Sequence, residues 1–158
     1  MNDDLDKAKE ILRQSELRIK GILNFSHELD NKIFKILGYV IALIYAFIFY
    51  LIIYKPKEIL LYISIFDITY LYIIMFFLIL AIRPSKYKGV GLPLEDFNND
   101  YSLQQVINDK AIKRYKNRFE NNKKINKRKS RYLYIALLLF YCLLIFTTIF
   151  YWLFKGIK

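Results

Sequence analysis

Three long runs of apolar residues divide the chain, at residues 36–54, 59–82 and 132–154. They contain 19, 24 and 23 residues, and Asp67 is the one charged residue among them. At about 1.5 Å per helical residue, each run is long enough to cross a hydrocarbon layer of roughly 30 Å. The pattern therefore predicts an all-α membrane protein with three transmembrane helices.

The residues around the first two runs predict a helix and a tight turn. From Leu5 to Leu29, apolar side chains recur at helical spacing with charged residues on the opposite face. We therefore expect residues 1–35 to form an amphipathic helix that continues into the first run. Residues 55–58, Lys-Pro-Lys-Glu, allow only a short turn, so the first two spans should form an antiparallel hairpin.

The longest polar segment, residues 83–131, starts as a loop and predicts a helix in its second half. Residues 86–93 are rich in turn formers. Ser102 and Gln105 then have the spacing of a helix-capping box, and no Gly or Pro follows until residue 156. We expect one long helix that carries the third span, with the amphipathic N-terminal helix packed against its polar half.

The net charge of +11 is distributed unevenly along the chain. Of the 25 Lys and Arg residues, 21 lie in residues 1–35 and 83–131, whereas the turn at 55–58 and the tail at 155–158 share four. Basic residues accumulate on the cytoplasmic side of a membrane. This distribution predicts a cytoplasmic N-terminus, a long cytoplasmic extension of the third helix, and an external turn and C-terminal tail.

Several classes of chemistry are disfavoured by composition. The three runs take 66 of the 158 residues, which leaves too little chain for a large soluble core. One cysteine, Cys142, and one histidine, His27, do not make a metal cluster or a nucleophilic triad. We predict a non-enzyme with no catalytic residues, no metal and no resident cofactor.

Asp67 is the most unusual residue of the spans, because intramembrane acids are costly and usually face a bundle interior or water. Two interpretations remain open. It either lines a cation-favouring path in a ring of subunits or serves as a polar contact between helices. Partners expected at a similar depth are Tyr45, Thr147 and Thr148.

Small residues at a spacing of four, Gly38, Ala42 and Ala46, mark one face of the first span for close helix packing. The partner helix is either in the same chain or in another subunit. We favour packing within the chain.

A dense basic stretch precedes the third span and consists of Lys123, Lys124, Lys127, Arg128, Lys129 and Arg131. Its position favours contact with anionic lipid headgroups over binding of nucleic acid. Any ligand pocket should be cytoplasmic, because phosphate and base recognition needs cations and aromatic rings. The residues we expect to form it are Arg83, Lys86, Tyr87, Lys88, Lys113 and Arg114.

The order of these parts, with Glu28-Leu29-Asp30-Asn31-Lys32 before the first span and Ala81-Ile82-Arg83-Pro84 closing the second, resembles the Pycsar transmembrane effector family. The resemblance extends over residues 24–154. It implies an anti-phage effector of the bacterial inner membrane that senses a cyclic pyrimidine mononucleotide, made by a partner cyclase. Such an effector permeabilises the membrane as a homo-oligomer. The resemblance carries no ligand residues.

Two other functions remain open from the sequence. One is an effector of the SLATT type that answers a cyclic oligonucleotide. The other is a constitutive accessory or immunity membrane protein, which would bind a different polypeptide and cause no growth arrest.

Overall fold

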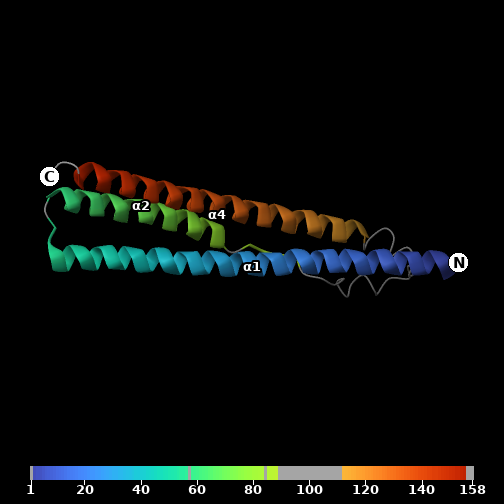
Figure 1. The fold of residues 1–158 in the computed structure, drawn as a ribbon. Helices are drawn as coiled ribbons and strands as arrows, with labels where there is room; N and C mark the ends of the chain where they lie inside the picture. Colours follow the sequence, from blue (N-terminus) through green and yellow to red (C-terminus); the bar gives the residue numbers. More distant parts are fainter. Residues whose placement is uncertain (1, 57, 84, 89–111, 156–158) are drawn as a thin grey trace. The chain divides into compact units, whose positions relative to one another are not determined.

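The computed structural model describes residues 2–56, 58–83, 85–88 and 112–155, which form three α-helices and no strand (Figure 1). The helices are α1 (Asn2–Tyr54), α2 (Glu58–Ile82) and α4 (Ile112–Lys155). All three are long and apolar enough to cross a membrane. The predicted all-α membrane fold is confirmed.

The first helix ends where the sequence places a proline. Lys55, directly after α1, has a positive φ of 40°, and Pro56 follows it. A proline ring disfavours the helical conformation of the residue before it, and a left-handed residue commonly closes a helix. The chain then reverses, and α2 begins at Glu58.

The chain divides into two compact units, and α1 and α4 contribute to both. Unit 1 comprises residues 1–28 and 84–127, and unit 2 comprises residues 29–83 and 128–158. The predicted capping box at Ser102 and Gln105 lies outside the described residues. From residue 112 to 155, however, α4 is continuous, as the absence of Gly and Pro predicts.

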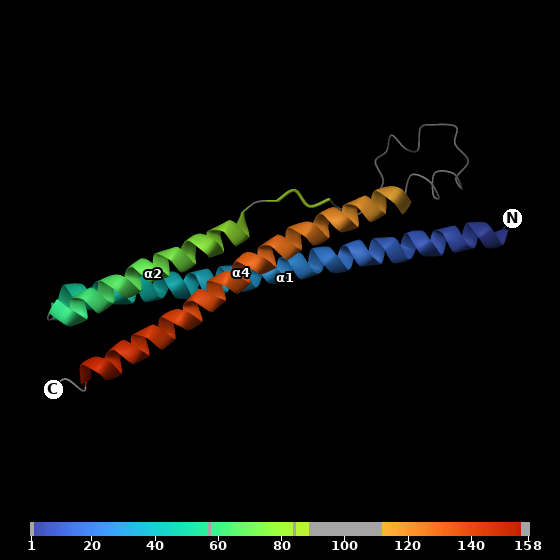
Figure 2. The ribbon, with the colours of Figure 1, turned by 90° about the horizontal axis from the view of Figure 1, so that it is seen from above.

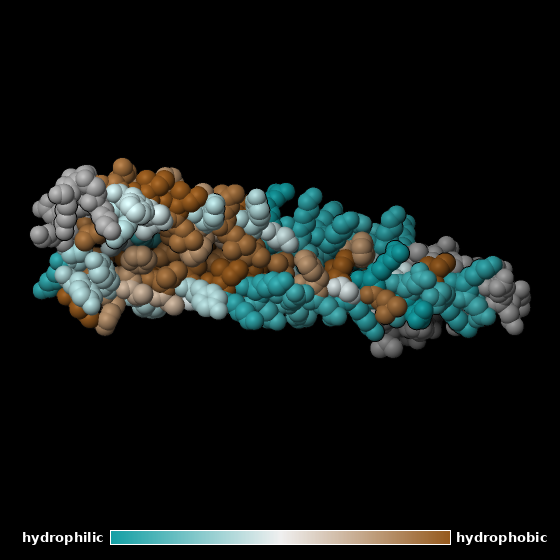
Figure 3. Space-filling model, viewed as in Figure 1, coloured by the Kyte–Doolittle hydropathy of each residue, from teal (hydrophilic) through white to brown (hydrophobic). Residues whose placement is uncertain are grey.

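Unit 2 is a bundle of three helical segments from α1, α2 and α4 (Figures 1 and 2). Its buried core follows spacings of three, four and seven residues, which places each set on one helix face. Its members are Leu29, Ile33, Val40, Ile44, Leu71, Ile74, Leu78, Ala81, Ala136 and Leu143. Large apolar side chains are also exposed on its outer surface, and the face seen in Figure 3 is mostly brown. An apolar exterior over an apolar core is what a bilayer requires.

Unit 1 pairs the polar parts of α1 and α4, and its surface in Figure 3 is mostly hydrophilic. Its apolar core is small, with Ile19 and Tyr115 buried and Leu12, Leu23 and Phe119 packed against them. The two helices run parallel, because Glu16 contacts Tyr115 and Ile22 contacts Asn126 further along both helices. The predicted packing of the N-terminal helix on the polar half of the last helix is confirmed.

Candidate functional site

A pocket of about 330 Å³ lies between α1 and α4 in unit 1. Ser15 and Arg18 are three residues apart on α1, so they share one helix face. From α4, two adjacent pairs one helical turn apart complete the lining. The full lining set is Ser15, Arg18, Tyr115, Lys116, Phe119 and Glu120.

Tyr115 forms a fixed aromatic floor in this pocket. The residue is 2% exposed, and its hydroxyl donates a hydrogen bond of 3.0 Å to Oε1 of Glu16. The guanidinium carbon of Arg118 lies 5.8 Å from the ring centroid, within the range of a cation–π contact. Phe119, half-buried one turn later, adds a second ring. The position of the Tyr115 ring is therefore set by contacts with residues outside the pocket lining.

Arg18 and Lys116 bring two positive charges to the pocket, and both side chains are exposed. Within the described part of the chain, no hydrogen bond or ion pair joins either of them to another residue. Glu120 also lines the pocket and pairs with neither cation. The pocket thus carries two unmatched cations from two different helices.

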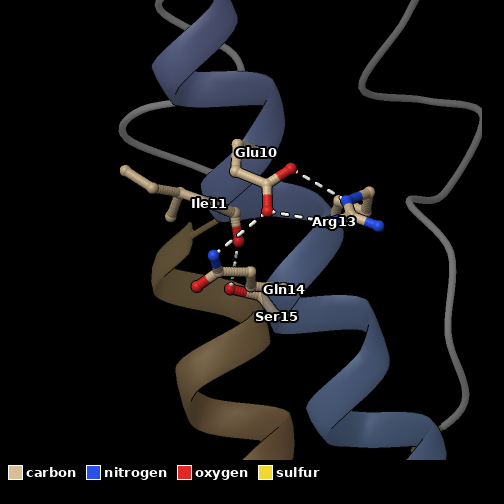
Figure 4. A network of polar contacts seen from close by, with 5 residues as sticks. All are labelled: Glu10, Ile11, Arg13, Gln14 and Ser15. Atoms are coloured by element: carbon tan, nitrogen blue, oxygen red, sulfur yellow. Dashed lines mark hydrogen bonds and ion pairs between the residues drawn. The ribbon is translucent and has the colours of Figure 1, made fainter.

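Arg13, by contrast, is committed to a neighbour on α1 (Figure 4). Its guanidinium donates bonds of 2.8 and 2.9 Å to the two carboxylate oxygens of Glu10. Gln14 donates a further bond of 3.1 Å to Glu10. The hydrogen bond from Arg13, followed by that from Gln14, lowers the pKa of the Glu10 carboxyl to about 2. Charge at this turn is matched within the helix.

Ser15 presents an acceptor to the pocket. Its hydroxyl donates to the carbonyl of Ile11 at 2.8 Å (Figure 4). The single hydroxyl proton is used there, which leaves the oxygen lone pairs for a donor on a ligand. The pocket therefore combines donors, acceptors and rings.

Tyr87 and Lys88, two of the predicted ligand residues, tie the segment 85–88 to α4, Tyr87 through its hydroxyl and Lys88 through its backbone. Asn122 accepts from the backbone N–H of Lys88 at 3.1 Å and donates to its carbonyl at 3.0 Å. The Tyr87 hydroxyl donates to Asn126 at 2.9 Å, and Asn126 donates to the carbonyl of Ile22 at 3.1 Å. This phenol is held by the fold rather than turned to a ligand.

None of the six residues predicted for a ligand site lines the pocket. The side chains of Lys86, Lys88 and Lys113 are exposed, and Arg114 is partly exposed. Arg83 belongs to unit 2. Sequence reasoning missed Arg18 and Lys116, although Ser15-x-x-Arg18 facing Tyr115-Lys116-x-x-Phe119 becomes recognisable once the two helices are paired in parallel.

In unit 2, Asp67 is buried and contacts α4 through Thr147. The hydroxyl oxygen of Thr147 lies 3.1 Å from Oδ1 of Asp67 and 2.9 Å from the carbonyl of Leu143. The prediction that Thr148 and Tyr45 also contact Asp67 is wrong. Thr148 is exposed and bonds the carbonyl of Leu144 in its own helix, and Tyr45 is 68% exposed. Their helix faces turn away from Asp67.

A groove of about 590 Å³ on unit 2 reaches Asp67 and Thr147 between α2 and α4. The rest of its lining is apolar and mostly aromatic, from Tyr62, Ile63, Phe66, Phe146 and Phe150. The polar pair is thus set in an otherwise apolar groove.

The expected intrachain packing of the small-residue face is wrong. Gly38, Ala42 and Ala46 are exposed, and a Cβ built on Gly38 would meet no atom within 4 Å. The reason is helical phase, because α1 turns Val40 and Ile44 into the bundle and places the small residues on the far side. Among the described residues, none covers this face at Gly38.

The prediction that the basic stretch contacts lipid headgroups is wrong for one of its members, Lys129. Lys129 is buried, and its Nζ lies 2.6 Å from Oδ1 of Asp30 on α1, so it does not face headgroups. The exposed members of the stretch are Lys123, Lys124, Lys127, Arg128 and Arg131.

The fold and these contacts define a multi-pass, all-α membrane protein with a polar helical unit. Among the described residues, no group of three or more His, Cys, Asp or Glu side chains is arranged to hold a metal ion. Comparison with protein-family models, curated proteins and solved structures finds no match to the chain.

Proposed function

We propose that this chain is a ligand-triggered effector of the bacterial inner membrane that permeabilises the bilayer as a homo-oligomer. The observation that supports it is the sharing of two helices. Both α1 and α4 supply residues to a polar unit with a charged pocket and to an apolar bundle of membrane-spanning character. One chain then contains both the part that binds the ligand and the part that permeabilises the membrane.

Helix continuity supplies a route from ligand to membrane. A ligand that binds one packing of α1 and α4 in unit 1 more tightly than another shifts the population toward that packing. A tenfold preference corresponds to about 1.4 kcal/mol. Because the same helices continue into unit 2, that bias acts on the spans.

The side of the membrane follows from charge. The positive-inside rule places residues 1–35 and 83–131 in the cytoplasm, where a cyclase product would accumulate. The resemblance to Pycsar effectors supplies the ligand class, a cyclic pyrimidine mononucleotide, and the anti-phage role. Three spans enclose little volume, so permeabilisation needs several copies of the chain.

The test is release of a fluorophore from vesicles of neutral and anionic lipid that carry the protein. We expect cyclic UMP or cyclic CMP to trigger release and purine cyclic mononucleotides to act weakly. Release by a cyclic oligonucleotide alone would support the SLATT-type alternative. Silence with every cyclic nucleotide, together with stable co-purification of a different polypeptide, would support an accessory protein and contradict the proposal.

A further inference from the structure

We infer that the pocket in unit 1 is a binding site for a small organic anion with a flat apolar ring and a hydrogen-bond donor. Arg18 and Lys116 would hold the anion, and Phe119, backed by the buried ring of Tyr115, would contact the ligand's ring. The inference rests on the proposed function for the claim that the chain responds to a ligand. It assigns that ligand to named residues.

The positive charge of the pocket favours an anionic ligand. Arg18 and Lys116 come from different helices, line the same small pocket, and pair with no described residue. Like charges around one pocket repel each other, whereas an anion between them pairs with both. Arg13, another cation on α1, differs from them because Glu10 in its own helix pairs with it.

The aromatic lining and the volume of the pocket favour a small anion that carries a flat ring. Phe119 is half-buried beside the buried ring of Tyr115, so a ligand with a flat ring covers apolar surface that inorganic phosphate would leave in water. A volume of about 330 Å³ is at the small end of the range for ligand pockets, which favours a small ligand.

Two hydrogen-bond acceptors in the pocket, Ser15 and Glu120, favour a ligand that also carries hydrogen-bond donors. Ser15 has used its proton on Ile11, and Glu120 presents a carboxylate with no partner among the described residues. Both groups favour a ligand that also carries N–H or O–H donors. Glu120 disfavours additional negative charge, so the ligand should carry a single anionic group.

The pocket is also placed to affect helix packing. Its residues come from α1 and α4, and Tyr115 bonds Glu16 across the same helix pair. A ligand held by Arg18 and Lys116 therefore joins the two helices that also form unit 2. Occupancy and the packing of these helices are linked.

The experiment measures binding by calorimetry with the full chain in nanodiscs of neutral lipid. The probes are cyclic UMP, cyclic CMP and inorganic phosphate, and phosphatidylglycerol is titrated separately. Arg18→Gln and Lys116→Gln should each weaken binding of the cyclic nucleotide at least tenfold, and Arg18→Glu should abolish it. Phe119→Leu should weaken nucleotide binding several-fold with little effect on phosphate.

Matched controls are Lys20→Gln on α1 and Lys124→Gln on α4, which remove the same charge from exposed side chains outside the pocket. Both should bind within twofold of the parent. Because Arg18 and Lys116 are exposed, their variants should keep the parent's helical content and unfolding midpoint.

The outcomes separate this site from the proposed function. Nucleotide-triggered dye release that persists unchanged in the Arg18 and Lys116 variants would overturn the site and leave the proposed function intact. Nucleotide binding that these variants lose, without any dye release by the parent, would support the site and contradict the function. Loss of phosphatidylglycerol binding alone would identify a headgroup contact and overturn the site.

Discussion

Lys129 and Asp30 form an ion pair inside unit 2, with Nζ of the lysine 2.6 Å from Oδ1 of the aspartate. The lysine side chain is 4% exposed and that of the aspartate 27%. The pair joins α4 to α1 one turn before Ile33, a fully buried core residue. A charge buried to this degree is tolerated because its partner is close.

Removing one partner of this pair should destabilise the protein strongly. Lys129→Met leaves the carboxylate without its cation, and we expect a loss of about 3 kcal/mol. Lys127→Met, at an exposed lysine in the same stretch, should change stability by less than about 0.5 kcal/mol. Denaturant unfolding in detergent, followed by circular dichroism, measures both.

The single variant Asp30→Leu and the double variant Asp30→Leu with Lys129→Met complete a mutant cycle, and the double variant should recover most of the loss. Additive losses in the double variant would mean that the two side chains do not stabilise each other. The short distance would then have no energetic role.

Asn122 should hold the segment 85–88 against α4. Its amide satisfies the backbone N–H and C=O of Lys88, and the side chain is fully buried. Asn122→Leu removes both bonds, and we expect a loss of about 2 kcal/mol. The amide of Lys88 should also exchange with solvent faster, which hydrogen exchange with mass spectrometry detects.

Asn117→Leu is the control for this change, because Asn117 is exposed on the same helix. It should leave exchange at Lys88 at the rate of the parent. Equal protection of Lys88 in the Asn122 and Asn117 variants would refute the anchoring role.

Thr147 and Thr148 offer a matched pair for the contact at Asp67. Thr147 reaches Asp67 on α2, whereas Thr148 bonds only within α4 and is exposed. Thr147→Val should cost about 1 kcal/mol, which is typical of a hydrogen bond between membrane helices. Thr148→Val should cost much less. Thermal unfolding in nanodiscs compares the two.

Asp67→Asn tests the two interpretations of the buried acid. An asparagine keeps a partner for Thr147, so a purely interhelical role predicts little change in stability and in vesicle permeability. We expect this result, since Asp67 is 2% exposed. Loss of cation preference in the released ions would instead assign Asp67 to a permeation path.

The sequence predicts the helices well because each span is decided by local composition. The apolar run from residue 59 to 82 matches α2 (Glu58–Ile82), and the turn is set by Pro56. Which side of a helix faces its neighbour depends on the relative phase of two helices. Single-helix periodicity leaves that phase open.

Several of the errors concern this phase. Lys129 lies among similar basic residues, and only the pairing with α1 distinguishes the buried one from the exposed ones. Thr147 and Thr148 are adjacent, so a rotation of about 100° about the helix axis decides which of them reaches Asp67. The pocket was missed for the same reason. Packing of the two helices was expected, but the phase that brings Arg18 and Lys116 to one pocket could not be read from either helix alone.

The exposed small-residue face of α1 predicts where copies of the chain associate. A Cβ at Gly38 has no atom within 4 Å, so Gly38→Leu should leave the fold intact and raise helix stability by up to about 1 kcal/mol. If the face packs against another copy, the larger side chain prevents close approach. Chemical cross-linking in vesicles measures the oligomer. We expect the Gly38 variant to form much less cross-linked oligomer than the parent and to lose most ligand-triggered dye release. Gly21→Leu is the control, because Gly21 is equally open but lies in unit 1. Persistence of the oligomer in the Gly38 variant would exclude this face as the interface, since the bundle itself places no contact there.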